Sequence, residues 1–143
     1  MADRKTQKLL EGLQQDLTRE VQAVLQYTYQ SAMVLGPRAL NLREYLRKEA
    51  EAELKHVSFL ADQIVNFGGV PKVAGSKFSE TKDLKQMLEN DLELERDAVL
   101  EYRERAKQAE LAGELGLKIR LEGLLAEESD HAHELERMLR GWQ

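Results

Sequence analysis

Two short segments of the sequence pair a glutamate with a histidine three positions later. They are residues 53–56 (ELKH) and 128–131 (ESDH). On a helix, residues three positions apart are neighbours on one face, so each segment would direct a carboxylate and an imidazole toward one point. Carboxylate oxygens and imidazole nitrogens together suit first-row divalent metals. The two segments therefore predict a metal centre to which both contribute.

The two segments belong to an internal repeat with an offset of 75 residues, which separates Glu53 from Glu128 and His56 from His131. The same offset relates Glu20 to Glu95. It also relates Tyr27 to Tyr102 and a series of apolar pairs: Leu9/Leu84, Leu13/Leu88, Leu17/Leu92, Val24/Val99, Leu46/Leu121, Leu60/Leu135, Ile64/Leu139 and Phe67/Trp142. We interpret the chain as a single domain, residues 1–143, made of two similar helical hairpins, residues 1–75 and 76–143, about a pseudo-twofold axis.

Apolar residues recur at helical spacings of three and four in four stretches of the chain. The pattern predicts helices over residues 6–35, 39–67, 82–111 and 114–140. Gly36 and Pro37 separate the first two helices, and residues 68–71 (GGVP) end the second. The chain is therefore predicted to be all-α.

The segment between the second and third predicted helices is long enough to run the whole length of the bundle. It spans about 48 Å when fully extended, whereas a helix of about 28 residues is about 42 Å long. A long crossover here makes these two helices parallel, which is the connectivity of a ferritin-like four-helix bundle. The four repeat-related glutamates each lie about 14 residues from the start of their own helix, so the bundle would bring them to one level.

Four carboxylates at one level of a core repel each other and lose hydration, so an empty site would either hold protons or cost several kcal/mol per ion. Two divalent cations would remove this penalty, and six ligands leave open positions for water, O2 or peroxide on two iron or manganese ions. A glutamate from each of two helices plus Glu-x-x-His from the other two is the pattern of di-iron carboxylate bundles. The predicted ligands are Glu20 and Glu95 as terminal carboxylates, Glu53 and Glu128 as bridges, and His56 and His131 with one metal each.

Several residues near the predicted ligands have roles that the sequence leaves open. Asp91, one turn before Glu95, is a candidate acceptor for a histidine N–H. Tyr27 and Tyr102 are either packing residues with a hydroxyl partner or electron and hydrogen-bond donors at the site, and we take Tyr27 as the candidate catalytic residue. Glu127 either points away from the core or assists the passage of iron. Asp130 and His133 are expected to be exposed.

Composition excludes several classes of function. The net charge of −5 argues against nucleic acid as a partner. No apolar run reaches the length of a membrane span, and the first residues lack the apolar core of a signal peptide, so a cytoplasmic location is expected. The absence of cysteine excludes disulfides, cysteine-ligated iron and thiol catalysis.

Over nearly its whole length the chain resembles the bacterioferritins of the ferritin-like superfamily. The resemblance lies in Glu20 followed by Gln26-Tyr27, in residues 53–56, 69–71 (GVP) and 91–95 (DLELE), and in Glu127-Glu128 leading to His131. It implies a ferroxidase that binds two Fe(II) ions per chain and oxidises them with O2 or H2O2. The product would be stored or passed on as ferric mineral inside a protein shell.

Two departures from the bacterioferritin pattern affect these expectations. The methionine that ligates haem directly after the second-helix glutamate is replaced by Leu54, and none of the four methionines matches that position, so no haem is expected. The family's short fifth helix has no counterpart before Gln143, which puts the large closed cage in doubt. A homo-oligomer is still expected, as a cage, a smaller shell like that of Dps miniferritins, or a dimer.

Two alternative functions remain open. The first is a rubrerythrin-like di-iron or manganese peroxidase without a rubredoxin domain, although Ala98 stands where an additional acid would favour it. The second is a metal-free helical interaction module, which would have to tolerate buried carboxylates without partners. The sequence does not choose between iron and manganese or between O2 and H2O2, and it does not fix the number of subunits or the presence of a mineral.

Overall fold

The computed structural model describes residues 3–142, and these residues form helices and connecting segments with no strand. The helices are α1 (Arg4–Met33), α2 (Ala39–Asn66), α3 (Leu84–Leu111) and α4 (Leu115–Arg140). Each lies within two residues of its predicted ends, so the all-α prediction is confirmed. The predicted domain limits, Met1 and Gln143, lie outside the described residues. None of the four helices is both long and apolar enough to cross a membrane.

Local signals define where the helices begin and end. The side chain of Asp3 accepts a hydrogen bond from the Thr6 amide at 2.8 Å and caps α1, and Asp83 caps α3 by accepting from the Lys85 amide at 2.9 Å. Gly36 follows α1 with a φ of 88°, a conformation that glycine adopts without steric cost. The chain then turns directly into α2.

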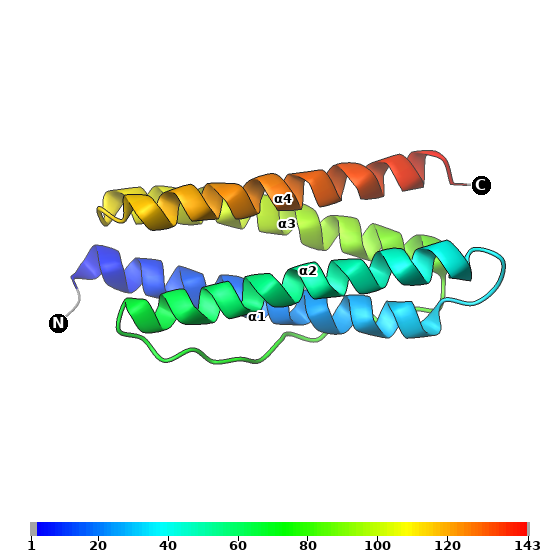
Figure 1. Cartoon of the computed structure of the whole chain (residues 1–143), viewed down its shortest axis with the longest axis horizontal. Helices are drawn as coiled ribbons and strands as arrows, with labels where there is room; N and C mark the ends of the chain where they lie inside the picture. Colours follow the sequence, from blue (N-terminus) through cyan, green and yellow to red (C-terminus); the bar gives the residue numbers. More distant parts are fainter. Residues whose placement is uncertain (1–2, 143) are drawn as a thin grey trace.

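The two hairpins are joined by the long connection that the sequence predicts. Figure 1 shows α1 and α2 antiparallel, α3 and α4 antiparallel, and residues 67–83 running along the bundle so that α2 and α3 are parallel. Gln14 on α1 holds this crossover with two hydrogen bonds, donating to the Lys72 carbonyl at 3.0 Å and accepting from the Lys72 amide at 2.9 Å. The ferritin-like connectivity is thus confirmed.

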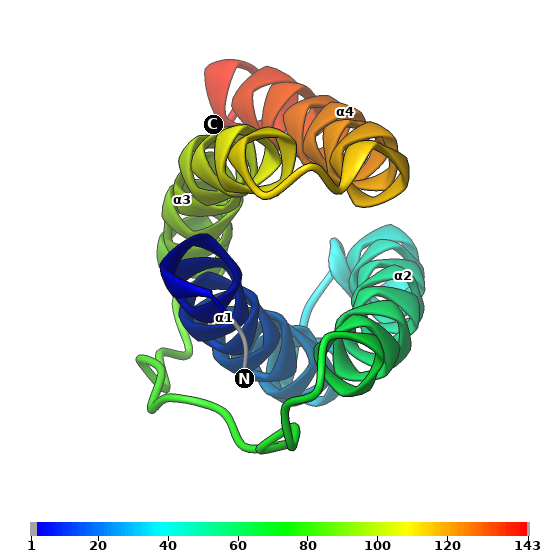
Figure 2. The ribbon, with the colours of Figure 1, turned by 90° about the vertical axis from the view of Figure 1, so that its left-hand side faces the viewer.

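The four helices enclose a core that is apolar toward both ends of the bundle and ionisable in its middle. Viewed along the axis, α1 packs against α2 and α3, and α3 packs against α4 (Figure 2). Repeat-related leucines are buried in both hairpins: Leu13 and Leu88, Leu17 and Leu92, Leu46 and Leu121, Leu60 and Leu135. Between these apolar layers the buried side chains are ionisable, and this middle layer holds the predicted ligands.

Candidate metal centre

All six predicted ligands lie together in the middle layer of the bundle. The four repeat-related glutamates are each only 1% exposed, and His56 is 4% exposed. They form two groups, in each of which the potential ligand atoms all lie within 4.8 Å of one another. The first group contains Glu20, Glu53, His56 and Glu128, and the second contains Glu49, Glu53, Glu95 and His131.

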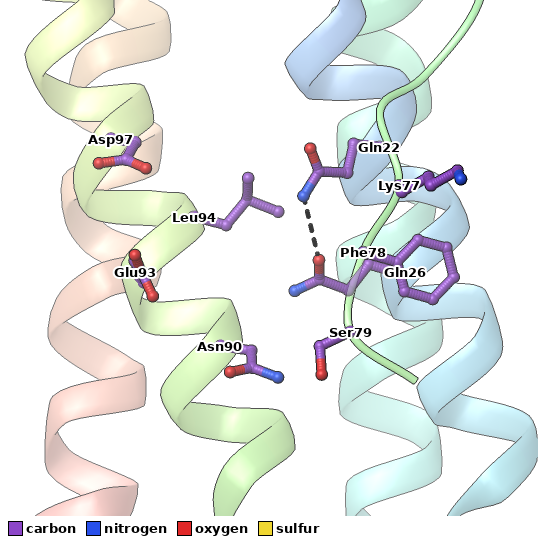
Figure 3. A pocket seen from close by; sticks show the side chains of 9 residues that line it. All are labelled: Gln22, Gln26, Lys77, Phe78, Ser79, Asn90, Glu93, Leu94 and Asp97. Carbon is purple, nitrogen blue, oxygen red and sulfur yellow. Dashed lines mark hydrogen bonds between the residues drawn. The ribbon is translucent and has the colours of Figure 1, made fainter. Parts of the chain in front are cut away.

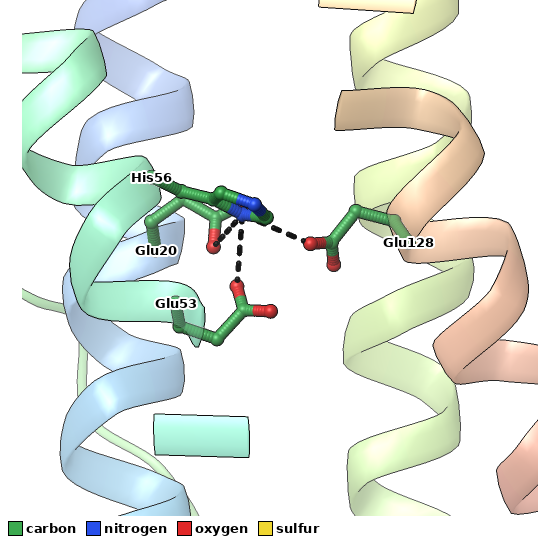
Figure 4. Close-up of side chains that lie close together, drawn as sticks. All are labelled: Glu20, Glu53, His56 and Glu128. Carbon is green, nitrogen blue, oxygen red and sulfur yellow. Dashed lines mark ion pairs between the residues drawn. The ribbon is translucent and has the colours of Figure 1, made fainter. Parts of the chain in front are cut away.

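In the first group the carboxylates surround one nitrogen of His56. Its Nδ1 lies 3.0 Å from Oε1 of Glu128, 3.6 Å from Oε2 of Glu53 and 3.7 Å from Oε2 of Glu20. Figure 4 shows these side chains converging from α1, α2 and α4. One cation near Nδ1 would be within reach of three helices.

The second group is built in the same way around His131. Its Nδ1 lies 3.1 Å from Oε2 of Glu49, 3.5 Å from Oε1 of Glu53 and 3.7 Å from Oε2 of Glu95. The two oxygens of Glu53 therefore face different histidines. Oε1 of Glu128, close to His56, is also 3.9 Å from Nδ1 of His131. This arrangement supports the predicted bridging role of both glutamates.

Glu49 is a candidate ligand that the sequence interpretation missed. It is 9% exposed and lies one helical turn before Glu53 on α2. Its counterpart in the repeat is Leu124, so a search for matched positions passed over it. The spacing of four residues from Glu53 was the signal available in the sequence.

Every residue of the two groups contributes at least one buried oxygen or nitrogen atom without a hydrogen-bond partner. Both oxygens of Glu53 and the Nδ1 atoms of both histidines are among them. Buried polar atoms in folded proteins are normally paired, so a cluster of unpaired ones indicates that another species completes the site. Carboxylate and imidazole donors in this number fit iron or manganese.

The protonation of the centre is strongly shifted. Burial, reinforced by the charge of Glu20, raises the pKa values of Glu53 and Glu128 well above their usual range. Burial opposes protonation of the histidines, but the facing carboxylates raise the pKa of His131 to about 9 and also raise that of His56. Without a cation the centre therefore holds protons, and a cation must displace them.

The two repeat-related tyrosines each orient a glutamate of the other hairpin. The hydroxyl of Tyr27 donates to Oε1 of Glu95 at 2.7 Å, and that of Tyr102 donates to Oε1 of Glu20 at 2.6 Å. Burial raises the pKa of both phenols well above the usual value, so both stay protonated as donors.

Contacts around the histidines differ from those predicted. The prediction that Asp91 accepts from a histidine is wrong, since its Oδ1 accepts instead from Gln26 at 2.8 Å. The outward nitrogen of His56, Nε2, lies 2.5 Å from Oε2 of Glu127, whose side chain is 58% exposed. Glu127 does point away from the core, but it reaches back to the imidazole. Asp130 and His133 are exposed, as predicted.

A surface pocket of the bundle is lined by none of the candidate ligands. It lies between α1, the crossover and α3, and Gln22, Gln26, Phe78 and Leu94 are among its lining residues (Figure 3). Gln26 also donates to the buried Asp91, so this amide links the lining of the pocket to the core.

Comparison with known proteins identifies relatives over nearly the full length. The model of the ferritin-like domain family matches residues 10–143. A bacterioferritin from Brucella melitensis is 30% identical over 92% of this chain and 83% of its own length. A nutrient stress-induced DNA-binding protein from Synechococcus is 26% identical over 94% of this chain and 82% of its own length. A crystal structure described as a ferritin-like, diiron-carboxylate protein from Bacillus anthracis superposes with a TM-score of 0.94 at 30% identity, covering 96% of this chain and 99% of that one.

Proposed function

The chain belongs to the ferritin-like domain family as a bacterioferritin-like member, and on this premise we propose that it is a haem-free ferroxidase. It binds two Fe(II) ions per chain, oxidises them with O2 or H2O2, and stores or detoxifies the iron. Iron is here the substrate. Glu20 and Glu95 hold one ion each, Glu53 and Glu128 lie between the two, and His56 and His131 complete the two positions.

The observation that carries this proposal is the set of unpaired donor atoms in the middle layer of the bundle. Seven residues from four helices direct buried oxygen and nitrogen atoms that lack a hydrogen-bond partner to one region. Leaving even one such group unpaired costs about 1–3 kcal/mol. A purely structural core would not retain them, whereas two cations pair them all.

The electron balance explains why two irons are bound together. Two Fe(II) ions give up two electrons, which with two protons reduce O2 to H2O2 or reduce H2O2 to two waters. The protons displaced from Glu53 and Glu128 when iron binds are available for this reaction.

We assign the tyrosines roles that follow from their hydrogen bonds. Tyr27 and Tyr102 hold Glu95 and Glu20 in the orientation for binding iron. Tyr27 is in addition the candidate catalytic residue, as a buried phenol that donates a hydrogen bond to Glu95 of the second group. The absence of haem and assembly into a homo-oligomer stay predictions.

A rubrerythrin-like peroxidase is the second candidate, because of Glu49. Ala98 lacks the additional carboxylate that would favour this activity, but Glu49 brings an extra carboxylate to the centre from α2. The two candidates differ in the preferred oxidant, which the following experiment measures.

The test is an anaerobic titration of metal-free protein with Fe(II), followed by addition of O2 or of H2O2 while ferric absorbance is recorded. We expect two irons bound per chain, rapid oxidation by O2, and further uptake beyond two irons. Glu53→Gln should lose binding and oxidation, whereas Glu51→Gln, an exposed neighbour on the same helix, should not.

Two irons that react quickly only with H2O2 would favour the peroxidase. A parallel titration with Mn(II) compares the two metals. The absence of any binding would overturn the proposal.

A further inference from the structure

Resting on the proposed function, we infer that the two metal positions are unequal. The position beside Glu95 and His131, termed the second position, binds a divalent cation first and more tightly. The position beside Glu20 and His56, termed the first position, binds second. Arg19 and Glu49 are the residues that set this difference.

Positive charge lies directly behind the first position. Nη2 of Arg19 is 3.7 Å from Oε1 of Glu20, and Nη1 of Arg19 is 3.1 Å from Oδ1 of Asp16. The guanidinium is nearly buried and lies over the Tyr102 ring, 4.9 Å from its centroid. Asp16 is shared with a second buried arginine, Arg105, whose Nε is 2.8 Å from Oδ2. Arg105 is also paired with Glu101, whose Oε2 lies 2.9 Å from its Nη2, so Arg19 is the cation of this cluster that acts on a candidate ligand.

Arg19 and a cation at the first position would share the carboxylate of Glu20. Nη2 of Arg19 lies 3.7 Å from Oε1 of this carboxylate, the oxygen that also accepts a hydrogen bond from Tyr102 at 2.6 Å. Arg19 therefore competes with a cation for the negative charge of Glu20.

The second position has the opposite surroundings. The repeat places Leu94 at the position of Arg19 and Gln30 at the position of Arg105. Asp91, the counterpart of Asp16, is bonded to the neutral amide of Gln26. Glu49 adds a buried carboxylate 3.1 Å from Nδ1 of His131, and its counterpart in the repeat is Leu124. The extra carboxylate at the first position, Glu127, is mostly exposed and contacts the outward Nε2 of His56 instead. Extra negative charge and the absence of these arginines both favour a divalent cation at the second position.

Because the two positions are expected to differ in affinity for a divalent cation, we measure binding of a metal that O2 does not oxidise. Metal-free protein is titrated with Co(II) in a calorimeter under argon. We expect two steps whose dissociation constants differ by at least about tenfold, since outer partners of metal ligands commonly change affinity 10–100-fold.

Two variants assign the steps. Glu49→Gln should weaken the tighter step by about 10–100-fold, with Glu51→Gln as a control that leaves both steps unchanged. Arg19→Gln should tighten the weaker step by about tenfold, whereas Arg19→Lys keeps the charge and should behave like the parent protein. Circular dichroism shows whether Arg19→Gln folds. If it does not, the titration of Arg19→Lys and the crystallographic measurement below decide which position binds Co(II) first.

The order of loading is read directly from crystals of the unaltered protein equilibrated with one Co(II) per chain. The anomalous difference map should show its main peak beside His131, Glu95 and Glu49. A main peak beside His56, or two equal peaks together with a single calorimetric step, would overturn the inference and leave the proposed function intact. The absence of Co(II) and Fe(II) binding altogether would instead overturn the proposed function.

Discussion

Asp16 and Asp91 occupy the same position in the two halves of the repeat, and both are completely buried, yet their surroundings are opposite. Asp16 is paired with the buried Arg105 at 2.8 Å and with Arg19 at 3.1 Å. Asp91 accepts one hydrogen bond from Gln26, and its Oδ2 has no hydrogen-bond partner. The repeat thus preserves the geometry of the candidate ligands, whereas the charge around them differs between the halves.

Space explains why only one half holds a buried arginine beside its aspartate. A Cβ atom at Gly12 would lie 1.8 Å from Nη1 of Arg105, so the guanidinium fits only because this residue is a glycine. The corresponding residue in the other half is Met87, which is 1% exposed and fills the equivalent space. Gln30 stands there in place of Arg105.

The different surroundings of Asp16 and Asp91 also act on their pKa values. Burial raises the pKa of both. For Asp16 the hydrogen bond and charge of Arg105 and the charge of Arg19 oppose this rise. For Asp91 the amide of Gln26 opposes it, the charges of Glu95 and Glu49 add to it, and the pKa reaches about 7. One aspartate is a partner for buried cations, and the other is a buried acid with an incomplete set of partners.

The largest expected effect comes from removing the charge of Asp16. Asp16→Asn removes the buried counterion that Arg105 shares with Arg19 and leaves Arg105 only the half-exposed Glu101, and this should lower the free energy of unfolding of the metal-free protein by about 3–5 kcal/mol. Urea unfolding followed by circular dichroism measures the change. A loss below about 1 kcal/mol would mean that the pair is not the main stabilising contact of this half.

A smaller loss is expected when the space for Arg105 is removed. Gly12→Ala should destabilise the metal-free protein by about 2 kcal/mol, because the guanidinium must leave Asp16. The same change in an Arg105→Gln background should be neutral or stabilising, since alanine favours a helix over glycine by about 1 kcal/mol. Equal losses in both backgrounds would contradict this explanation.

In the other half the corresponding change should stabilise the protein. Asp91→Asn keeps an acceptor for Gln26 and removes a buried charge, so we expect a gain of about 1–2 kcal/mol at pH 8. The sign follows from linkage. Between pH 4 and pH 7 the unfolded chain loses the Asp91 proton while the folded chain keeps it, so the parent protein loses stability as the pH rises.

The gain from Asp91→Asn should therefore be complete above pH 7 and vanish near pH 4. Urea unfolding at pH 4.5 and pH 8 measures both limits. A loss of stability at pH 8 would show that Asp91 is stabilised by a partner as Asp16 is.

The smallest effect on folding is expected at Glu127. Its side chain is mostly exposed, so Glu127→Gln should change the free energy of unfolding of the metal-free protein by less than about 1 kcal/mol. Because Glu127 contacts Nε2 of His56, Co(II) affinity at the first position should still fall by about tenfold. Glu122→Gln, exposed on the same helix, is the matched control. Equal affinities for the two variants would show that Glu127 does not position His56.

Much of this architecture was determined by the sequence alone. Helical periodicity and the breaks at Gly36 and Gly68 predicted the ends of the four helices to within two residues. The length of the segment between the second and third helices predicted how the helices are connected. The offset of 75 residues picked out four glutamates and two histidines that the structure brings together. These features are local or repeated, so spacing along the chain is sufficient to identify them.

Tertiary structure alone decided which side chains surround those ligands. Glu49 near His131, Glu127 on His56, and Arg105 rather than an amide beside Asp16 are contacts between different helices. Such contacts depend on how each helix is rotated and how closely its neighbour approaches, which a single glycine changes by making room for a guanidinium. The sequence determined the candidate ligands, but the packing of one helix against another determined the charge that acts on each.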